Sequence, residues 1–149
     1  MKLDGSTTVA QRAADVFDRL LDPDFLARCI PGCERMERRE DGSYEAVVKA
    51  GVGAIKGSFR GVVTLSEVVS PESYRMSLSG KSTVGFVEGS ALIRLEADAE
   101  GEGERTWIHY DGEARVSGVI ASVGGRLVDA AARKVCRQFF ERLAQEVGQ

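Results

Sequence analysis

Hydrophobic and polar residues alternate with a period of two over most of the chain, from Glu34 to Val116. That period is typical of strands that bury one face. Turn signals interrupt the alternation at residues 41–42, 51–53, 70–71, 81–85 and 101–103. The pattern therefore predicts six antiparallel strands joined by short turns.

Helical spacing flanks this region on both sides. Residues 4–9 are predicted as a strand, 11–21 as a helix with one apolar face, and 23–29 as a second short helix that begins with a proline. After Gly118, apolar residues recur at every fourth position up to Val147, which predicts a long helix with a wide apolar face. The Gly124-Gly125 pair is expected to bend or start that helix.

A helix with so wide an apolar face must be covered by something broad. The order of elements therefore predicts an α+β fold in which a curved seven-stranded antiparallel sheet wraps around the C-terminal helix. At 149 residues the chain is expected to form one domain, residues 1–149.

The predicted inward face of the sheet carries small residues where a filled core would carry Leu or Ile. Examples are Gly57, Gly61, Gly80 and Gly112, and the helix has Ala131 and further small residues opposite them. Two interpretations stand at this point: the glycines leave a ligand cavity, or they serve the coiling and bulges of a strongly bent sheet.

If the cavity exists, we expect it to be lined by inward residues of the strands and the helix: Tyr44, Val48, Phe59, Gly61, Met76, Leu78, Phe86, Ile93, Tyr110, Gly112, Val123, Leu127 and Ala131. The inward set offers tyrosines but no carboxylate, histidine or lysine that would act as acid or base. His109 alternates outward. The sequence thus disfavours an enzyme, and no catalytic residue or cofactor is predicted.

Charge and cysteine content narrow the function classes further. The net charge of −3 gives no reason to expect nucleic-acid binding. No apolar run is long enough for a membrane span or a secretory signal, so a cytoplasmic location is expected. The three cysteines are predicted to be free thiols, and Cys29-Ile-Pro-Gly-Cys33 is interpreted as a turn, because its spacing suits neither a redox pair nor a metal site.

Two apolar residues on the outward face, Leu92 and Trp107, are expected to form a contact patch. A homodimer or a docked partner would use it.

Four stretches of the chain resemble the CoxG family of carbon monoxide dehydrogenase subunits, within the START-like (SRPBCC) helix-grip superfamily. They are CIPGCE at 29–34, VGAIKGSFRGVVTL at 52–65, GFVEGSALIRL at 85–95 and the region from VSGVIASVGG at 116–125 to VCRQFF at 135–140. Together they cover nearly the whole chain.

The resemblance implies a helix-grip fold with an apolar cavity and a non-catalytic accessory role. It implies a quinone or lipid as ligand, a molybdenum hydroxylase such as carbon monoxide dehydrogenase as partner, and contact with the inner face of the cytoplasmic membrane. A polyketide cyclase or dehydratase on the same fold is the alternative. Some members of the family continue into an apolar tail that attaches to the membrane, whereas this sequence ends at Gly148-Gln149, so anchoring through such a tail is not expected.

Overall fold

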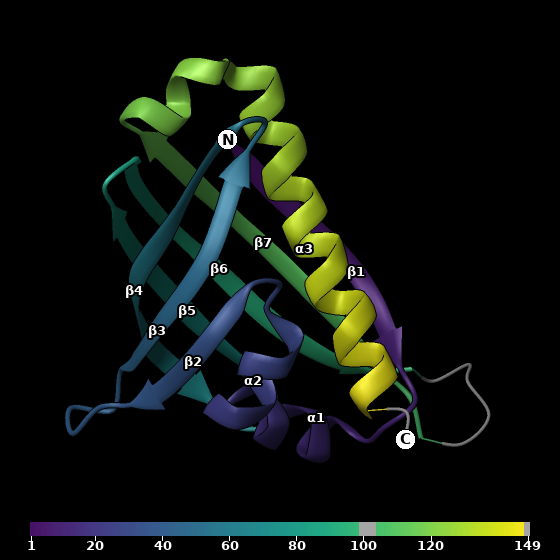
Figure 1. Ribbon diagram of the computed structural model, residues 1–149. Coiled ribbons are helices and arrows are strands. Elements are labelled where there is room, and N and C mark those ends of the chain that lie inside the picture. The colour runs from purple at the N-terminus through teal and green to yellow at the C-terminus, as the bar shows by residue number, and fades with distance from the viewer. Residues whose placement is uncertain (99–103, 148–149) are drawn as a thin grey trace.

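A computed structural model describes residues 1–98 and 104–147. Seven antiparallel strands form one curved sheet in the order β1-β7-β6-β5-β4-β3-β2, and a long helix crosses its concave face (Figure 1). The strands are β1 (Lys2–Val9), β2 (Cys33–Arg38), β3 (Tyr44–Val52), β4 (Ile55–Val69), β5 (Ser73–Ser82), β6 (Gly85–Ala97) and β7 (Thr106–Ser117). The predicted curved seven-stranded sheet around a C-terminal helix is confirmed.

Two short helices, α1 (Ala13–Leu20) and α2 (Pro23–Cys29), connect β1 to β2 and cover one end of the sheet (Figure 1). Pro23 opens α2 at a position that needs no N–H donor, and the Asp22 side chain accepts a hydrogen bond from the backbone N–H of Asp24 at 3.0 Å. The predicted bounds of α2 are confirmed. The predicted helix at 11–21 is two residues shorter at its N-terminal end.

The predicted C-terminal helix is interrupted. A 3-10 segment, η1 (Val119–Val123), comes first, and α3 (Gly125–Val147) starts only after Gly124. Gly118 and Gly124 have φ angles of +90° and +103°, conformations that side-chain-bearing residues rarely adopt. The glycine pair therefore starts the helix rather than bending it, and the chain turns twice before α3.

The turns expected near residues 41–42, 51–53, 70–71 and 81–85 all join neighbouring strands. The turn expected at 101–103 lies outside the described residues.

Buried side chains form two clusters on the inner face of the sheet, not one. The larger cluster joins α1, α2 and the C-terminal half of α3 to the sheet, with Phe17, Phe25, Ile108 and Leu143 at its centre. The smaller one consists of Val52, Phe59 and Ile120, with Val123 and Ala131 packed against it. The candidate site lies between these clusters.

Candidate functional site

The inner face of the sheet is incompletely filled where it passes under α3. Val48, Met76 and Leu78 belong to the inward set of their strands, yet each is only partly buried. Aromatic side chains within the two clusters are well buried: Tyr74 in the larger one is 5% exposed and Phe59 in the smaller one is 6% exposed. The middle of the concave face is therefore accessible, while its two ends are packed.

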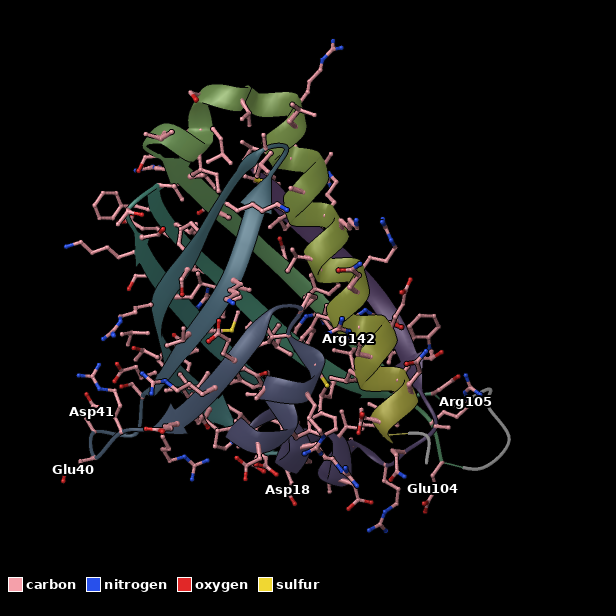
Figure 2. All side chains as sticks on the ribbon, viewed as in Figure 1. Asp18, Glu40, Asp41, Glu104, Arg105 and Arg142 are labelled. Atoms are coloured by element: carbon pink, nitrogen blue, oxygen red, sulfur yellow. The ribbon has the colours of Figure 1, made fainter. Side chains whose placement is uncertain are left out.

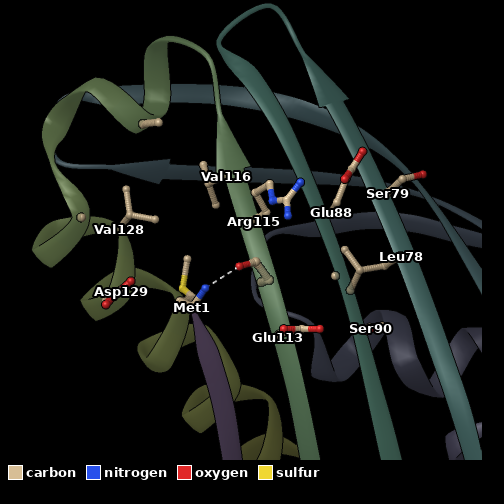
Figure 3. A pocket seen from close by; sticks show the side chains of 14 residues that line it. Met1, Leu78, Ser79, Glu88, Ser90, Glu113, Arg115, Val116, Val128 and Asp129 are labelled. Carbon is tan, nitrogen blue, oxygen red and sulfur yellow. Dashed lines mark hydrogen bonds between the residues drawn. The ribbon is translucent and has the colours of Figure 1, made fainter.

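A pocket of about 680 Å³ occupies part of this region, between η1, the first turns of α3 and strands β5 to β7 (Figure 3). Its apolar wall is formed by Leu78, Gly89, Ala114, Val116, Ala121, Gly125 and Val128. The volume falls within the range typical of small-molecule sites, about 300–1,000 Å³.

Polar groups also border this pocket. Asp129 contributes from α3, and the amino group of Met1 lies at the pocket, where it donates a hydrogen bond to the carbonyl of Ala114 at 2.8 Å (Figure 3). Strand residues that alternate with the inward ones also border the pocket, but their side chains belong to the outer face of the sheet: Ser79, Glu88, Ser90, Glu113 and Arg115. The pocket thus has apolar walls with the Asp129 carboxylate at its border, which suits an amphipathic ligand better than a pure hydrocarbon.

The inward glycines divide into two kinds. A Cβ placed on Gly61 would have only the carbonyl oxygen of Ser79 within 4 Å, at 3.4 Å, and one placed on Gly80 would meet nothing closer than 3.8 Å. A Cβ on Gly112 would lie 2.5 Å from the carbonyl oxygen of Ser90, and one on Gly57 2.5 Å from the Ser82 hydroxyl. Gly61 and Gly80 face open space. At Gly112 the backbone of Ser90 approaches closely, and at Gly57 the side chains of Ser82 and Val84 do so.

The residues predicted from sequence to line a cavity are dispersed in the structure. Leu78 lines the pocket under η1, and Tyr110 lines a second groove. Tyr44, Phe59 and Ile93 are buried in the packed clusters, and Val48 and Met76 pack partly buried against the larger one. The remaining helix residues, Val123 and Ala131, pack against the smaller cluster, and Leu127 between them is 53% exposed.

Phe86 does not face the hollow, so its placement among the ligand-binding residues is corrected. It pairs with Lys81 on β5 and Ser117 on β7, while the inward residues of β6 are its neighbours Gly85 and Val87. The side chain is 48% exposed, with the Lys81 ammonium 5.7 Å from its ring centroid. Gly112 leaves no room for a Cβ, and its place among the ligand-binding residues stays a prediction.

Three tyrosines lie on the inner face of the sheet, and two of them are buried in the larger cluster. The Tyr44 hydroxyl donates to the carbonyl of Leu21 at 2.7 Å and accepts from Arg38 at 3.1 Å. Burial raises the pKa of Tyr74 far above its usual value, so this phenol stays protonated. Tyr110 alone borders open space: its ring stacks on Phe140 at 4.5 Å, and burial raises its pKa.

Tyr110 and Phe140 belong to the second groove, about 470 Å³ in volume, which lies between β1 and α3. Leu3, Asp4, Arg133, Cys136 and Arg137 also line it. Its α3 residues lie on the opposite side of the helix from Ala131, which packs against the smaller cluster. The sequence did not distinguish this groove from the pocket under η1.

The Cys29–Cys33 stretch is a turn that closes α2. Gly32 has φ +77°, and its carbonyl accepts from the backbone N–H of Lys49 at 2.9 Å. Burial raises the pKa of Cys29 to about 11 and also raises that of Cys33, so both thiols stay protonated near neutral pH. Within residues 1–98 and 104–147, no group of three or more His, Cys, Asp or Glu side chains is placed to hold a metal ion.

His109 lies on the outer face, as predicted. Its ring is hydrogen-bonded to the Ser6 hydroxyl at 2.7 Å and to the Glu96 carboxylate at 3.0 Å, and it stacks on Trp107 at 6.0 Å. Leu92 pairs with Asp111 whereas Trp107 pairs with Glu96, so the row that contains His109 separates the two. The contact patch expected at Leu92 and Trp107 is therefore not continuous.

Several pocket residues were not predicted from the sequence, chiefly Gly89, Val128 and Asp129. Continuing the alternation of β6 backwards from Ala91 would have identified Gly89. Asp129 carries no such signal, because its position at the pocket depends on where α3 starts.

The architecture is a helix-grip fold, in which a curved sheet wraps around the C-terminal helix with a pocket between the two. A START superfamily protein from Mycobacterium smegmatis has a TM-score of 0.69 at 13% identity, covering 98% of this chain and 96% of its own. The aromatase/cyclase Zhui from Streptomyces sp. R1128 has a TM-score of 0.67 at 15% identity, covering 99% of this chain and 93% of its own. At these identities the likeness concerns the fold alone.

The chain belongs to the CoxG family of carbon monoxide dehydrogenase subunits, whose model matches residues 5–148. A conserved protein from Geobacillus kaustophilus is similar over 99% of this chain and 95% of its own, with a TM-score of 0.89 and 26% identity. No curated protein sequence matches the chain. None of the helices in the described part of the chain is long and apolar enough to span a membrane.

Proposed function

We propose that this protein is a non-catalytic accessory protein that binds an apolar ligand with a polar head, a quinone or a lipid, in the pocket under η1 and α3. We further propose that it serves a molybdenum hydroxylase such as carbon monoxide dehydrogenase, at the inner face of the cytoplasmic membrane. The observation that carries the proposal is the unfilled middle of the concave face, which opens into a pocket of about 680 Å³ between two packed clusters.

The chemistry of the walls supports binding over catalysis. Leu78, Val116 and Val128 offer apolar surface, while Asp129 and the amino group of Met1 offer partners for a polar headgroup. The two tyrosines of the larger cluster are occupied by burial or by hydrogen bonds. Membership of the CoxG family supports the link to carbon monoxide dehydrogenase.

A cyclase-like enzyme is the second candidate, because the neighbour Zhui is an aromatase/cyclase. The side chain that favours it is Asp129, a carboxylate at the pocket that could act as a base. Turnover of a polyketide-like substrate that is lost in Asp129→Asn would support this alternative and contradict the accessory role.

Native mass spectrometry of purified protein, followed by organic extraction, tests the binding proposal. We expect a retained apolar molecule, or else a thermal shift when ubiquinone or menaquinone is added. Absence of both results would exclude the carrier function. A pull-down with purified carbon monoxide dehydrogenase tests the partner separately, and failure to recover the enzyme would contradict that part alone.

A further inference from the structure

One end of the molecule combines exposed apolar side chains with unpaired cations. It is formed by η1, the start of α3, the β3–β4 turn and the β5–β6 turn, which lie together at the top of Figure 1. The turns are held against one another: the backbone N–H of Ile120 donates to the carbonyl of Val84 at 2.8 Å, and Gly118 packs on Gly85.

Three large apolar side chains are exposed at this end: Phe86 at 48%, Val119 at 57% and Leu127 at 53%. They come from three different elements, β6, η1 and α3. Exposed large apolar side chains gathered from separate elements are typical of a contact surface.

Cations outnumber carboxylates at this end. Residues 50–60, 79–87 and 115–127 contain Lys56, Arg60, Lys81, Arg115 and Arg126 but no Asp or Glu. Across the described residues, none of these five lies within 4.0 Å of a carboxylate partner, whereas Lys49, farther from the turn, is paired with Glu34. Glu88 and Asp129 are the first carboxylates beyond these segments.

The opposite end carries charges of both signs, with Arg105 beside Glu104 and Arg12 paired to Asp15 and Glu104 (Figure 2). Asp18, Glu40, Asp41 and Glu104 lie there, at the bottom of the view in Figure 2. The two ends differ in pairing: Arg12 and Arg105 at the opposite end have carboxylate partners, whereas the cations named above have none among the described residues and lie where apolar side chains are also exposed. Phe86 and two cations are direct neighbours, because Arg60, Lys81 and Phe86 pair in one row across β4, β5 and β6.

We propose that this end, the basic tip defined by Phe86, Val119 and Leu127 with Lys56, Arg60, Lys81 and Arg126, docks on an anionic lipid bilayer. Cations draw the tip to the negatively charged surface, and the apolar side chains enter the boundary between headgroups and acyl chains. A bilayer satisfies both features at once, since it offers dispersed negative charge above an apolar layer.

Docking in this orientation places the pocket beside the membrane, because Ala121 of η1 and Gly125 and Val128 of α3 line it. That consequence, exchange of an apolar ligand with the bilayer, rests on the proposed function. The docking deepens the membrane location of the proposed function by naming the surface that makes the contact, and it is argued from the charge and exposure of the tip.

Flotation with vesicles tests the docking. We expect the wild-type protein to bind vesicles of phosphatidylcholine that contain about one third phosphatidylglycerol, and not to bind vesicles of pure phosphatidylcholine. Binding to the anionic vesicles should weaken at high salt. Each Lys or Arg near an anionic surface contributes about fivefold in binding, so the double variant Arg60→Glu/Lys81→Glu should lose at least about 25-fold. Phe86→Ser/Val119→Ser should lose about tenfold with no change in charge.

Arg39→Glu/Arg94→Glu is the matched control, since it changes net charge equally at exposed positions away from the tip. We expect it to reduce binding far less than the tip reversal does. Equal loss in the two charge variants, or no binding of the wild type to anionic vesicles, would overturn the proposal. The proposal would also be overturned if the tip variants bound vesicles as the wild type does but bound purified carbon monoxide dehydrogenase more weakly. That result would assign the tip to contact with an acidic protein surface.

Ligand retention measured on the same samples separates this proposal from the proposed function. The substituted side chains do not line the pocket, so the tip variants should keep their ligand while losing vesicle binding. A wild type that binds vesicles but retains and accepts no quinone or lipid would overturn the carrier function and leave the docking intact.

Discussion

Replacing Gly61 by Leu is expected to fill space beneath α3 without unfolding the protein. Gly61 lies inward on β4, paired with Ala46 on β3 and Gly80 on β5, and it is diagonal to the pocket residue Leu78. A Cβ there would have only the carbonyl oxygen of Ser79 in contact, at 3.4 Å. Gly61 is not among the residues with positive φ, so a side chain introduces no backbone strain.

Two opposing effects set the magnitude. A glycine in a strand is about 0.5–1 kcal/mol less favourable than a residue with a side chain, because it loses more conformational freedom on folding. Overpacking a filled core would cost about 1–3 kcal/mol. With open space at Gly61, we expect the free energy of unfolding of Gly61→Leu to lie within about 1 kcal/mol of the wild type, which is a Tm change of about 2–4 °C for a chain of this size.

Gly112→Leu is the matched control. Its Cβ would lie 2.5 Å from the carbonyl oxygen of Ser90 and 2.8 Å from the Cβ of Ala91, and the backbone at Ser90 cannot move away without breaking the β6–β7 pairing. We expect this variant to lose about 3 kcal/mol or more. Urea denaturation of both variants measures the difference.

Gly80→Leu repeats the test from the paired position, where contacts begin at 3.8 Å. Ala131→Leu, on the helix side, is less informative because Ala131 already packs against the smaller cluster. If Gly61→Leu and Gly80→Leu unfold as readily as Gly112→Leu, there is no open space beneath the helix. If both fold normally but keep the ligand at wild-type affinity, the space is not the binding site.

The fold was predictable because its signals are local and repeated. Alternation over six strands, proline at the start of α2 and the four-residue spacing of α3 each specify an element independently, and together they leave one arrangement in which the helix is covered. The break at Gly124 was only half predicted, since two adjacent glycines do not tell whether a helix bends or begins.

The lining of the pocket was less predictable, for two physical reasons. A large apolar residue beside a turn does not have to face inward: Phe86, one residue after Gly85, was assigned to the inner face, although the alternation of β6 continued back from Ala91 places it outward. The space opposite a glycine also depends on how closely the next strand approaches, and Gly61 and Gly112 look alike in sequence while only one faces open space. Charge at the tip, by contrast, is readable from the sequence once the turns that meet there are known.

Further predictions concern the turn after α2 and its thiols. Gly32→Ala should destabilise the protein by about 1–3 kcal/mol or more in urea denaturation. Gly32 has φ +77°, and a Cβ there would collide with the carbonyl of Lys49. An unchanged denaturation midpoint would contradict this geometry. Tyr44→Phe should cost about 1 kcal/mol by removing the hydrogen bond to Leu21, a loss that the same measurement detects. Cys33, which is partly exposed, should react with iodoacetamide before the fully buried Cys29, as peptide mass mapping would show. Cys29 should also make stability depend on alkaline pH. Its pKa is about 11 in the folded protein and 9.0 without burial, so the folded state binds the proton more tightly, and the resulting stabilisation is complete below pH 9 and lost as pH rises through 11. The full loss is about 2–3 kcal/mol by linkage. The free energy of unfolding of the wild type should therefore fall more steeply between pH 9 and pH 11 than that of Cys29→Ala, which has no thiol at this position to ionise. Parallel curves for the two proteins would show that burial does not hold the Cys29 thiol protonated.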